Sequence, residues 1–382
     1  MSSTTTLTEQ PTTNGVKPAM NGEHSTTSGE HFETNGAATT SNHREPMKLS
    51  GALDGIKSFD VTPMIGREFP TASLKEWLYS PNSDELIRDL AITISRRGVV
   101  FFRAQDGMTN EDQKRLAQKI GELAGKPATS KLHIHPFSNF NGTPEDKDNQ
   151  ISVISNNGFK GPYKPSAALE IKQTQKDGWH SDITFEKVPS DYCILRLTEV
   201  PETGGDTMWA SGYEVYDRIS PAYQQFLEKL TATYAQPVFQ RGANGAASNL
   251  YTDERGAPEN VGDGLTAIHP VVRTNPVTGW KSIYPIGYHA RRINEVSEDE
   301  SRHLLDWFTR LVVENHDLQV RHRWQNKNDV AIWDNRSVYH TPTFDTEAPR
   351  TGHRAVSLGE RPYLDKGSCG RRAGLKAEGA MW

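Results

Sequence analysis

The sequence predicts a mainly β protein in which peripheral helices pack around a core of two sheets. Short runs rich in β-branched and aromatic residues, separated by Gly, Pro and Asn, fill the middle and the C-terminal part of the chain. Amphipathic segments with helical spacing lie before and between them. The sequence has no internal repeat and no regular alternation of strand and helix, so a doubly wound nucleotide-binding sheet is not expected.

The N-terminal segment is expected to be a tail. Residues 1–48 are rich in Ser, Thr, Asn, Gly and Glu and contain almost no large apolar side chains. Burial could not offset the entropy lost on ordering such a segment. We therefore predict a disordered tail over residues 1–48 and a single domain over residues 49–382.

The first regular elements are a helix and a strand. Apolar residues recur at helical spacing over residues 81–97, and Gly98 is a suitable residue to end a helix. The apolar run 99–102 that follows is short and β-branched, which is typical of a buried strand.

Two further helices are predicted from their capping residues. Thr109 is followed three residues later by Asp112, and Ser297 by Glu300, as in a capping box. Each pair precedes an apolar stripe with helical spacing. The remaining β-prone runs are Tyr192–Leu197, Ile268–Arg273, Val330–Trp333 and Ala355–Leu358.

Composition limits the partners and the compartment. The chain of 382 residues has 43 basic and 48 acidic residues and no basic block, so nucleic acid is not an expected partner. No run approaches the ~18 apolar residues of a membrane span, and no secretory signal is evident. The two cysteines, Cys193 and Cys369, lack the spacing of a metal or disulfide motif, which favours the reducing cytoplasm.

The candidate metal ligands are His180, Asp182 and the distant His340. If the chain is extended at residues 180–182, the two side chains there point to the same face, and a third ligand could come from another strand. Two imidazoles and one carboxylate form the facial triad of non-haem Fe(II) oxygenases. The alternatives are a hydrogen-bonded core histidine and a histidine at a strand end.

Two arginines follow the last of these residues. Arg350 and Arg354 could grip carboxylates or similar anions through paired N–H groups, a geometry that Lys cannot reproduce. The alternative is that both are ordinary surface cations.

Over residues 97–362 the sequence resembles the taurine dioxygenase (TauD/TfdA-type) family, and in particular its fungal sulfonate-dioxygenase-like branch. The resemblance depends on four segments in a fixed order, residues 179–185, 203–209, 269–274 and 333–336. It implies a double-stranded β-helix, or jelly roll, with Fe(2+) as the metal and with 2-oxoglutarate and O2 as co-substrates.

The resemblance also implies roles for individual residues. His180, Asp182 and His340 match the iron ligands, and Thr207 and Arg350 match positions that bind the far carboxylate of 2-oxoglutarate. Ten residues separate His340 from Arg350, one fewer than in the taurine enzyme. If the register is shifted over that loop, Arg350 and Arg354 exchange roles.

On the substrate side, Arg354 and His135 match the groups that hold a sulfonate, which would make a doubly cationic site. Tyr284 matches an aromatic wall of the pocket, although an aromatic residue in a β run is more often part of the core. Lys176 stands where the taurine enzyme has an amide, and Ser138 where it has an aromatic hydroxyl. Lys176 is therefore expected to contact a substrate other than taurine.

The implied activity is the hydroxylation of a small anionic organic substrate, in the first place an organosulfonate that then releases sulfite and an aldehyde. The same chemistry on a carboxylate, a sulfate ester, an aryloxy acid or a specialised metabolite stays open. A zinc hydrolase or a cupin-like binding module could use the same ligands but would leave Thr207 and Arg350 without a role. Whether the chain forms a homo-oligomer also stays open.

Overall fold

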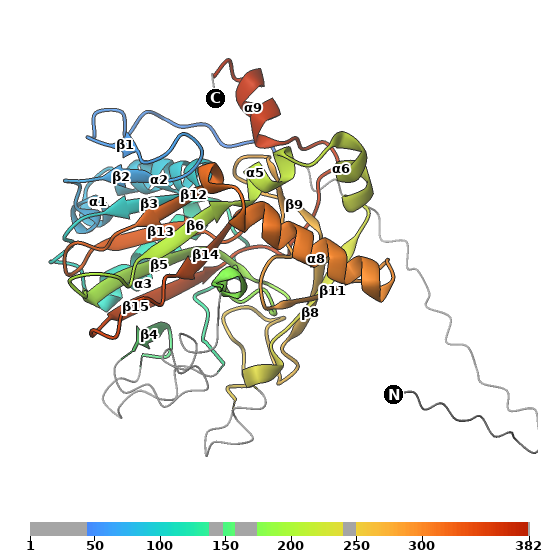
Figure 1. The fold of residues 1–382 in the computed structure, drawn as a ribbon. Coiled ribbons are helices and arrows are strands. Elements are labelled where there is room, and N and C mark those ends of the chain that lie inside the picture. Colours follow the sequence, from blue (N-terminus) through green and yellow to red (C-terminus); the bar gives the residue numbers. More distant parts are fainter. Residues whose placement is uncertain (1–43, 137–147, 157–173, 240–249, 381–382) are drawn as a thin grey trace, which may run out of the picture. The chain divides into compact units, whose positions relative to one another are not determined.

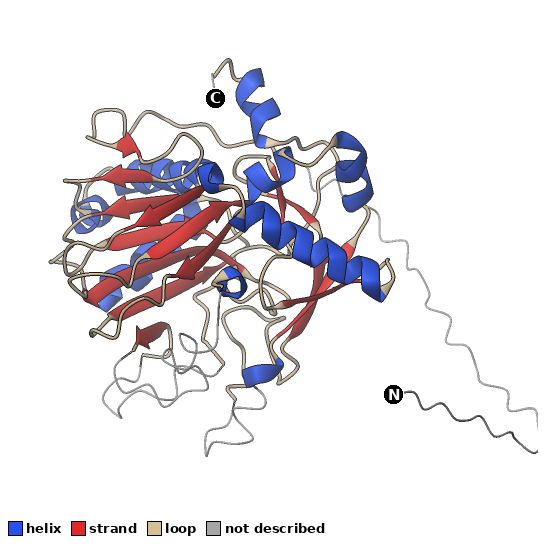
Figure 2. Ribbon diagram, in the orientation of Figure 1, coloured by secondary structure: helices blue, strands red, loops and turns tan. Residues whose placement is uncertain are grey.

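Two sheets pack against each other across an apolar core (Figures 1 and 2). The computed structural model describes residues 44–136, 148–156, 174–239 and 250–380. The larger sheet has the strand order β1-β2-β3-β13-β5-β15-β4, and the sheet that faces it has the order β12-β6-β14. In the order of the larger sheet, its strands are Phe59–Asp60, Arg67–Phe69, Val99–Phe102, Val330–Asp334, Ser190–Glu199, Thr351–Leu358 and Ile151–Ser155. The strands of the facing sheet are Gln319–His322, Thr207–Ser211 and Val338–Pro342.

Strand β3 explains why its sequence is apolar without interruption. Successive side chains of a strand point to opposite faces of the sheet. Phe101 points into the core between the two sheets, where its ring lies 5.4 Å from that of Trp209 on β6. Phe102 belongs instead to the cluster under the helices and stacks on Phe69 at 5.0 Å. Both faces of β3 are therefore buried, as predicted for residues 99–102.

Three helices cover the outer face of the larger sheet through this second apolar cluster. They are α1 (Leu74–Tyr79), α2 (Ser83–Arg97) and α3 (Asn110–Leu123). The predictions for the last two are confirmed. Helix α2 ends at Gly98, which has a positive φ of 76°, and α3 begins with the reciprocal Thr109–Asp112 capping box.

A third apolar cluster joins most of the remaining strands and helices. Strands β11, β7 and β8 form one small sheet in that order, and strands β10 and β9 form another. In chain order these strands are β7 (Thr231–Ala235), β8 (Thr266–Pro270), β9 (Val272–Thr274), β10 (Lys281–Ile283) and β11 (Ala290–Ile293). The helices and helical turns are η2 (Lys176–Gly178), α5 (Gly212–Asp217), α6 (Pro221–Leu227), α8 (Glu298–Val313), η3 (His316–Leu318) and α9 (Arg371–Ala377). The capping box predicted at Ser297 and Glu300 is present at the start of α8.

The mainly β class and the jelly-roll arrangement are confirmed, and one predicted strand is corrected. The run 268–273, predicted as one strand, is divided between β8 and β9. Pro270 has no N–H, and the N–H of Val271 donates to Leu230 instead of continuing the ladder. None of the described helices combines the length and the apolar character that crossing a bilayer requires.

The predicted boundary of the tail lies too far along the chain. The N–H of Met47 donates to the carbonyl of Val277 at 2.8 Å, and its side chain packs against the cluster under the helices. The guanidinium of Arg44 donates to the carbonyl of Gly125. The domain therefore begins at or before Arg44, while residues 1–43 lie outside the described chain.

Candidate active site

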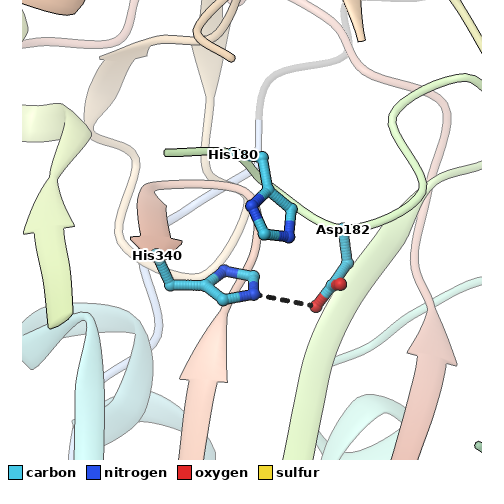
Figure 3. A group of neighbouring side chains, drawn as sticks. All are labelled: His180, Asp182 and His340. Atoms are coloured by element: carbon cyan, nitrogen blue, oxygen red, sulfur yellow. Dashed lines mark ion pairs between the residues drawn. The ribbon is translucent and has the colours of Figure 1, made fainter. Parts of the chain in front are cut away.

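The side chains of His180, Asp182 and His340 lie together, and one ligand atom from each falls within 4.8 Å of the others (Figure 3). The two imidazole rings are 4.3 Å apart between centroids. Nε2 of His340 lies 3.7 Å from Oδ2 of Asp182. Residues up to 160 positions apart in sequence thus form one compact cluster of two nitrogen ligands and one oxygen ligand.

The backbone brings the two histidines together directly. The N–H of His180 donates to the carbonyl of His340 at 3.1 Å, and the N–H of His340 donates back at 2.8 Å. His340 lies on β14, so this bridge attaches the segment of His180 to the sheet of β12, β6 and β14. The extended strand considered for residues 180–182 is not formed. Asp182 lies in a turn, and Ile183 after it has a positive φ of 46°.

Gly287 allows His180 to lie where it does. It forms a bridge with His180 and has a φ of +95°. A Cβ at this position would lie 2.2 Å from the carbonyl oxygen of Trp179 and 2.8 Å from Cα of His180. Only glycine tolerates both the conformation and the close approach.

Both histidines are held in the neutral form that binds metals. Burial lowers the pKa of His180, and it lowers the pKa of His340 to about 3. Nδ1 of His180 lies 2.9 Å from the carbonyl of Gly178, which makes Nδ1 the protonated nitrogen and leaves Nε2 as the ligand atom.

Asp182 is held as a carboxylate. Burial alone would raise its pKa, but the charge of Arg354 and smaller contributions from His340, His180 and Cys193 together outweigh burial, and the pKa lies well below its usual range. Nη1 of Arg354 donates to Oδ1 at 2.5 Å. The amide of Asn335 lies 3.4 Å from Oδ2 and also accepts from the N–H of Asp182 at 3.1 Å. Two neutral imidazoles and one ionised carboxylate are a donor set that suits Fe(II).

A partly buried guanidinium without a carboxylate partner among the described residues lies at Arg350. Its Nε donates to the carbonyl of Gly205 at 2.8 Å, and its Nη2 donates to Oγ1 of Thr207 at 3.2 Å. No carboxylate within the described chain forms an ion pair with it. Burial lowers the pKa of Arg350 to about 10, so it remains charged at neutral pH. Such a cation can receive an anion.

The loop that contains Gly204 and Gly205 makes room for this arginine. Gly205 has a φ of +66°, and a Cβ there would lie 2.9 Å from Cδ of Arg350. The glycine loop and the arginine are thus fitted to each other.

His135 is buried near the cluster, but it does not add a second cation. Its ring lies 5.0 Å from that of Phe239. Burial, followed by the charge of Arg354, lowers the pKa of His135 well below its usual value. The site was expected to hold two cations. Only Arg354 is charged, because the imidazole of His135 near it is neutral.

The two remaining candidates have contacts elsewhere. The side chain of Lys176 is 42% exposed, and its Nζ lies 3.4 Å from Oδ1 of Asp306 on α8. Tyr284 is 1% exposed, and its ring lies under the guanidinium of Arg273 at 4.9 Å within the third apolar cluster. This matches the alternative that Tyr284 is a core residue. Ser138 lies outside the described residues.

Sequence reasoning missed several groups around the cluster. The ring of Tyr288 lies 4.9 Å from that of His180, and His289 is buried 6.4 Å away. Asn335 stands within the segment 333–336, but nothing in the sequence indicates that its amide contacts Asp182. A glycine followed by two aromatic side chains is the only local signal for Tyr288 and His289.

A jelly roll that carries a His-Asp-His cluster defines the class of iron- and 2-oxoglutarate-dependent dioxygenases. Comparisons with known proteins agree. A sequence model of the taurine catabolism dioxygenase TauD, TfdA family matches residues 57–356, and the chain belongs to that family. It is a 2-oxoglutarate-dependent dioxygenase, which sets aside the zinc hydrolase and the cupin-like binding module.

Individual relatives give the range of similarity. The alpha-ketoglutarate-dependent dioxygenase btcD of Neocamarosporium betae is 52% identical, over 86% of this chain and 98% of that protein. The alpha-ketoglutarate-dependent sulfonate dioxygenase of Saccharomyces cerevisiae is 31% identical, over 81% of this chain and 68% of that protein. A crystal structure of a taurine dioxygenase from Burkholderia xenovorans matches with a TM-score of 0.60 at 24% identity, covering 82% of this chain and 92% of that one.

Proposed function

We propose that His180, Asp182 and His340 hold Fe(II), and that Thr207 and Arg350 bind the far carboxylate of 2-oxoglutarate. The proposal depends on a difference between two guanidinium groups. Arg354 lies on β15, and Arg350 lies in the loop before β15. Arg354 already has a carboxylate partner in Asp182, whereas Arg350 is partly buried and has none among the described residues. Arg350 is therefore the group that needs an external dianion such as 2-oxoglutarate.

When bound, the iron couples the oxidative decarboxylation of 2-oxoglutarate by O2 to the hydroxylation of a C–H bond, with succinate and carbon dioxide as the other products. The protein contributes binding and orientation. The Gly205 carbonyl and the Thr207 hydroxyl fix the direction of the Arg350 guanidinium, so its remaining N–H groups are oriented before the co-substrate arrives. Asn335 and Arg354 hold the two oxygens of Asp182.

The substrate that we propose is a small organic anion, in the first place an organosulfonate. Arg354 is the cation beside the cluster, and His135 is a buried imidazole near it. The relationship to the yeast sulfonate dioxygenase supports this choice. Hydroxylation of the carbon that carries the sulfonate would yield an aldehyde and sulfite. We place the reaction in the cytoplasm, since both cysteines are free thiols.

A second candidate is the same reaction on a different anion, such as a carboxylate, a sulfate ester or a specialised metabolite. Two observations favour it. The relative that is 52% identical carries no sulfonate in its name, and it is more similar than the sulfonate dioxygenase at 31%. Lys176, which replaces an amide of the taurine enzyme, is engaged with Asp306 on α8.

A substrate panel separates the two candidates. The iron-loaded enzyme is incubated with 2-oxoglutarate, O2 and each member of a set of alkyl sulfonates, alkyl sulfates, aryloxy acids and carboxylic acids, and both succinate and sulfite are measured. Succinate together with an equal amount of sulfite from a sulfonate supports the first candidate. Substrate-dependent succinate from another anion without sulfite supports the second, and no succinate under any condition contradicts both.

A further inference from the structure

We propose that Trp324 is a positioning residue for the co-substrate site: its indole N–H occupies an acceptor site of the Thr207 hydroxyl and so directs the hydroxyl proton toward the bound carboxylate. This inference depends on the proposed binding of 2-oxoglutarate by Thr207 and Arg350. It concerns a side chain that would not itself touch the co-substrate.

The hydrogen bonds of Thr207 carry the argument. Its Oγ1 accepts from Nε1 of Trp324 at 3.1 Å and from Nη2 of Arg350 at 3.2 Å. A threonine hydroxyl has two acceptor lone pairs and one proton to donate. Both lone pairs are therefore occupied, and the hydroxyl donates to no acceptor of the described protein. The proton remains available for a ligand, and the neighbouring Arg350 selects an anionic one.

Tryptophan suits this role because its indole nitrogen is only a donor. A side chain that could also accept, such as Gln or Tyr, could take the Thr207 proton and leave nothing for the ligand. The indole is 3% exposed and lies in the core between the two sheets. Its ring packs edge-on against His322 at 4.9 Å. Packing therefore fixes the N–H before any ligand binds, which reduces the entropy lost on binding.

The test measures the affinity of the anaerobic iron-loaded enzyme for 2-oxoglutarate, together with KM and kcat. Trp324→Phe removes the N–H, as does replacement of Trp324 by benzothienylalanine, which keeps the shape of the indole. Trp280→Phe is the control, because Trp280 is a buried tryptophan in a separate apolar cluster. Thr207→Val removes the hydroxyl, and Thr207→Ser retains it.

We expect each variant that loses the N–H to weaken 2-oxoglutarate binding by about 5- to 20-fold, with kcat at saturating co-substrate within about twofold of wild type. Thr207→Val should weaken binding similarly, and Thr207→Val combined with Trp324→Phe should add little further, because both act through one hydroxyl. Thr207→Ser should weaken binding less than Thr207→Val does, and Trp280→Phe should bind as wild type does.

The outcomes distinguish this inference from the proposed function. If Arg350→Gln and Thr207→Val weaken binding while both Trp324 variants retain full affinity, the role of Trp324 is wrong and the co-substrate site stands. Additive losses in the double variant also overturn the role of Trp324. If Arg350→Gln itself retains full affinity, the proposed co-substrate site is wrong.

Discussion

Asp182 supplies the negative charge of the candidate metal centre, so its removal should abolish iron binding. In Asp182→Ala a neutral methyl replaces the anionic ligand, and we expect iron affinity to fall on the order of 100-fold or more. Iron content after anaerobic loading and dialysis measures the effect. Because Asp182→Ala also leaves Arg354 without its partner, His340→Ala is the second variant. Asp306→Ala, which removes an exposed carboxylate on α8, should keep its iron. Full iron occupancy in both ligand variants would contradict the assignment.

Substitution of Arg350 and substitution of Arg354 should impair different steps of the reaction. Arg350→Gln should raise the requirement for 2-oxoglutarate with every substrate, at a cost on the order of 2–4 kcal/mol, because a charge-assisted contact is lost. Arg354→Gln should still bind 2-oxoglutarate but should lose coupled turnover of anionic substrates and release succinate without hydroxylation. Anaerobic titration with 2-oxoglutarate measures the affinity for the co-substrate. Binding is monitored through the charge-transfer absorption of the iron complex. If Arg354→Gln weakens that titration and Arg350→Gln does not, their roles are exchanged.

At the scale of residues, sequence reasoning found groups whose chemistry is unusual and missed those whose role depends on packing. His180, Asp182 and His340 were predicted as a set, and the structure brings them together. Asn335 and Trp324 act through hydrogen bonds to residues 153 and 117 positions away, which no local pattern reveals. The exposure and ion pair of Lys176 depend on the position of α8 and were equally hidden.

At the scale of elements, the bridge between His180 and Gly287 supports the metal centre. Gly287→Ala should disturb it, because the added Cβ would lie 2.2 Å from the carbonyl oxygen of Trp179. Gly262→Ala is a matched control: its φ is also positive, at +79°, but nothing lies within 4 Å of the new Cβ. Both variants should lose on the order of 1 kcal/mol of stability from backbone strain, and Gly287→Ala should lose more because of the clash. Only Gly287→Ala should also lose iron affinity, and equal iron affinity in the two variants would show that the bridge does not support the site.

Elements with strong local signals were predicted well. Helix α2 with its terminal glycine, α3 and α8 with their capping boxes, and the apolar β3 all lie where the sequence indicated. The segment of Asp182 was considered as a strand and is a turn, because its conformation is set by the bridge to His340 and not by local propensity. Strand pairing over 160 positions, from His180 to His340, cannot be read from one sequence.

At the scale of the whole molecule, the first prediction concerns the N-terminal segment. Deletion of residues 1–43 should leave thermal stability and turnover unchanged, since the composition of that segment cannot support a core. Deletion of residues 1–48 should cost about 1–2 kcal/mol, because it also removes the contacts of Arg44 and Met47. Chemical denaturation of the two truncated proteins measures the difference. A large loss in the shorter deletion would show that residues 1–43 contribute to the fold.

The second whole-molecule prediction concerns acid stability. Burial, followed by the charge of Arg103, lowers the pKa of His322 to about 3, against about 6.5 in an unfolded chain. Below about pH 6.5 the unfolded state takes up a proton that the folded state cannot, so stability present above that pH is lost as the pH falls toward 3.

His322→Gln removes this group, and its stability should fall less steeply than that of wild type between about pH 6.5 and 4.5, by up to ~1.4 kcal/mol per pH unit. Denaturant midpoints across this pH range provide the measurement. His303→Gln, on the exposed face of α8, should follow the wild-type curve. Parallel curves for His322→Gln and wild type would show that His322 is not buried as a neutral ring.

The central claim is that one ion and one co-substrate bind at stated residues, and iron-edge anomalous diffraction tests it most directly. Crystals would be grown without oxygen in the presence of Fe(II) and 2-oxoglutarate. The predicted result is one strong anomalous peak within coordination distance of His180, Asp182 and His340, with the far carboxylate of 2-oxoglutarate on Arg350 and Thr207. An anomalous peak at other residues, or the far carboxylate on Arg354, would contradict it.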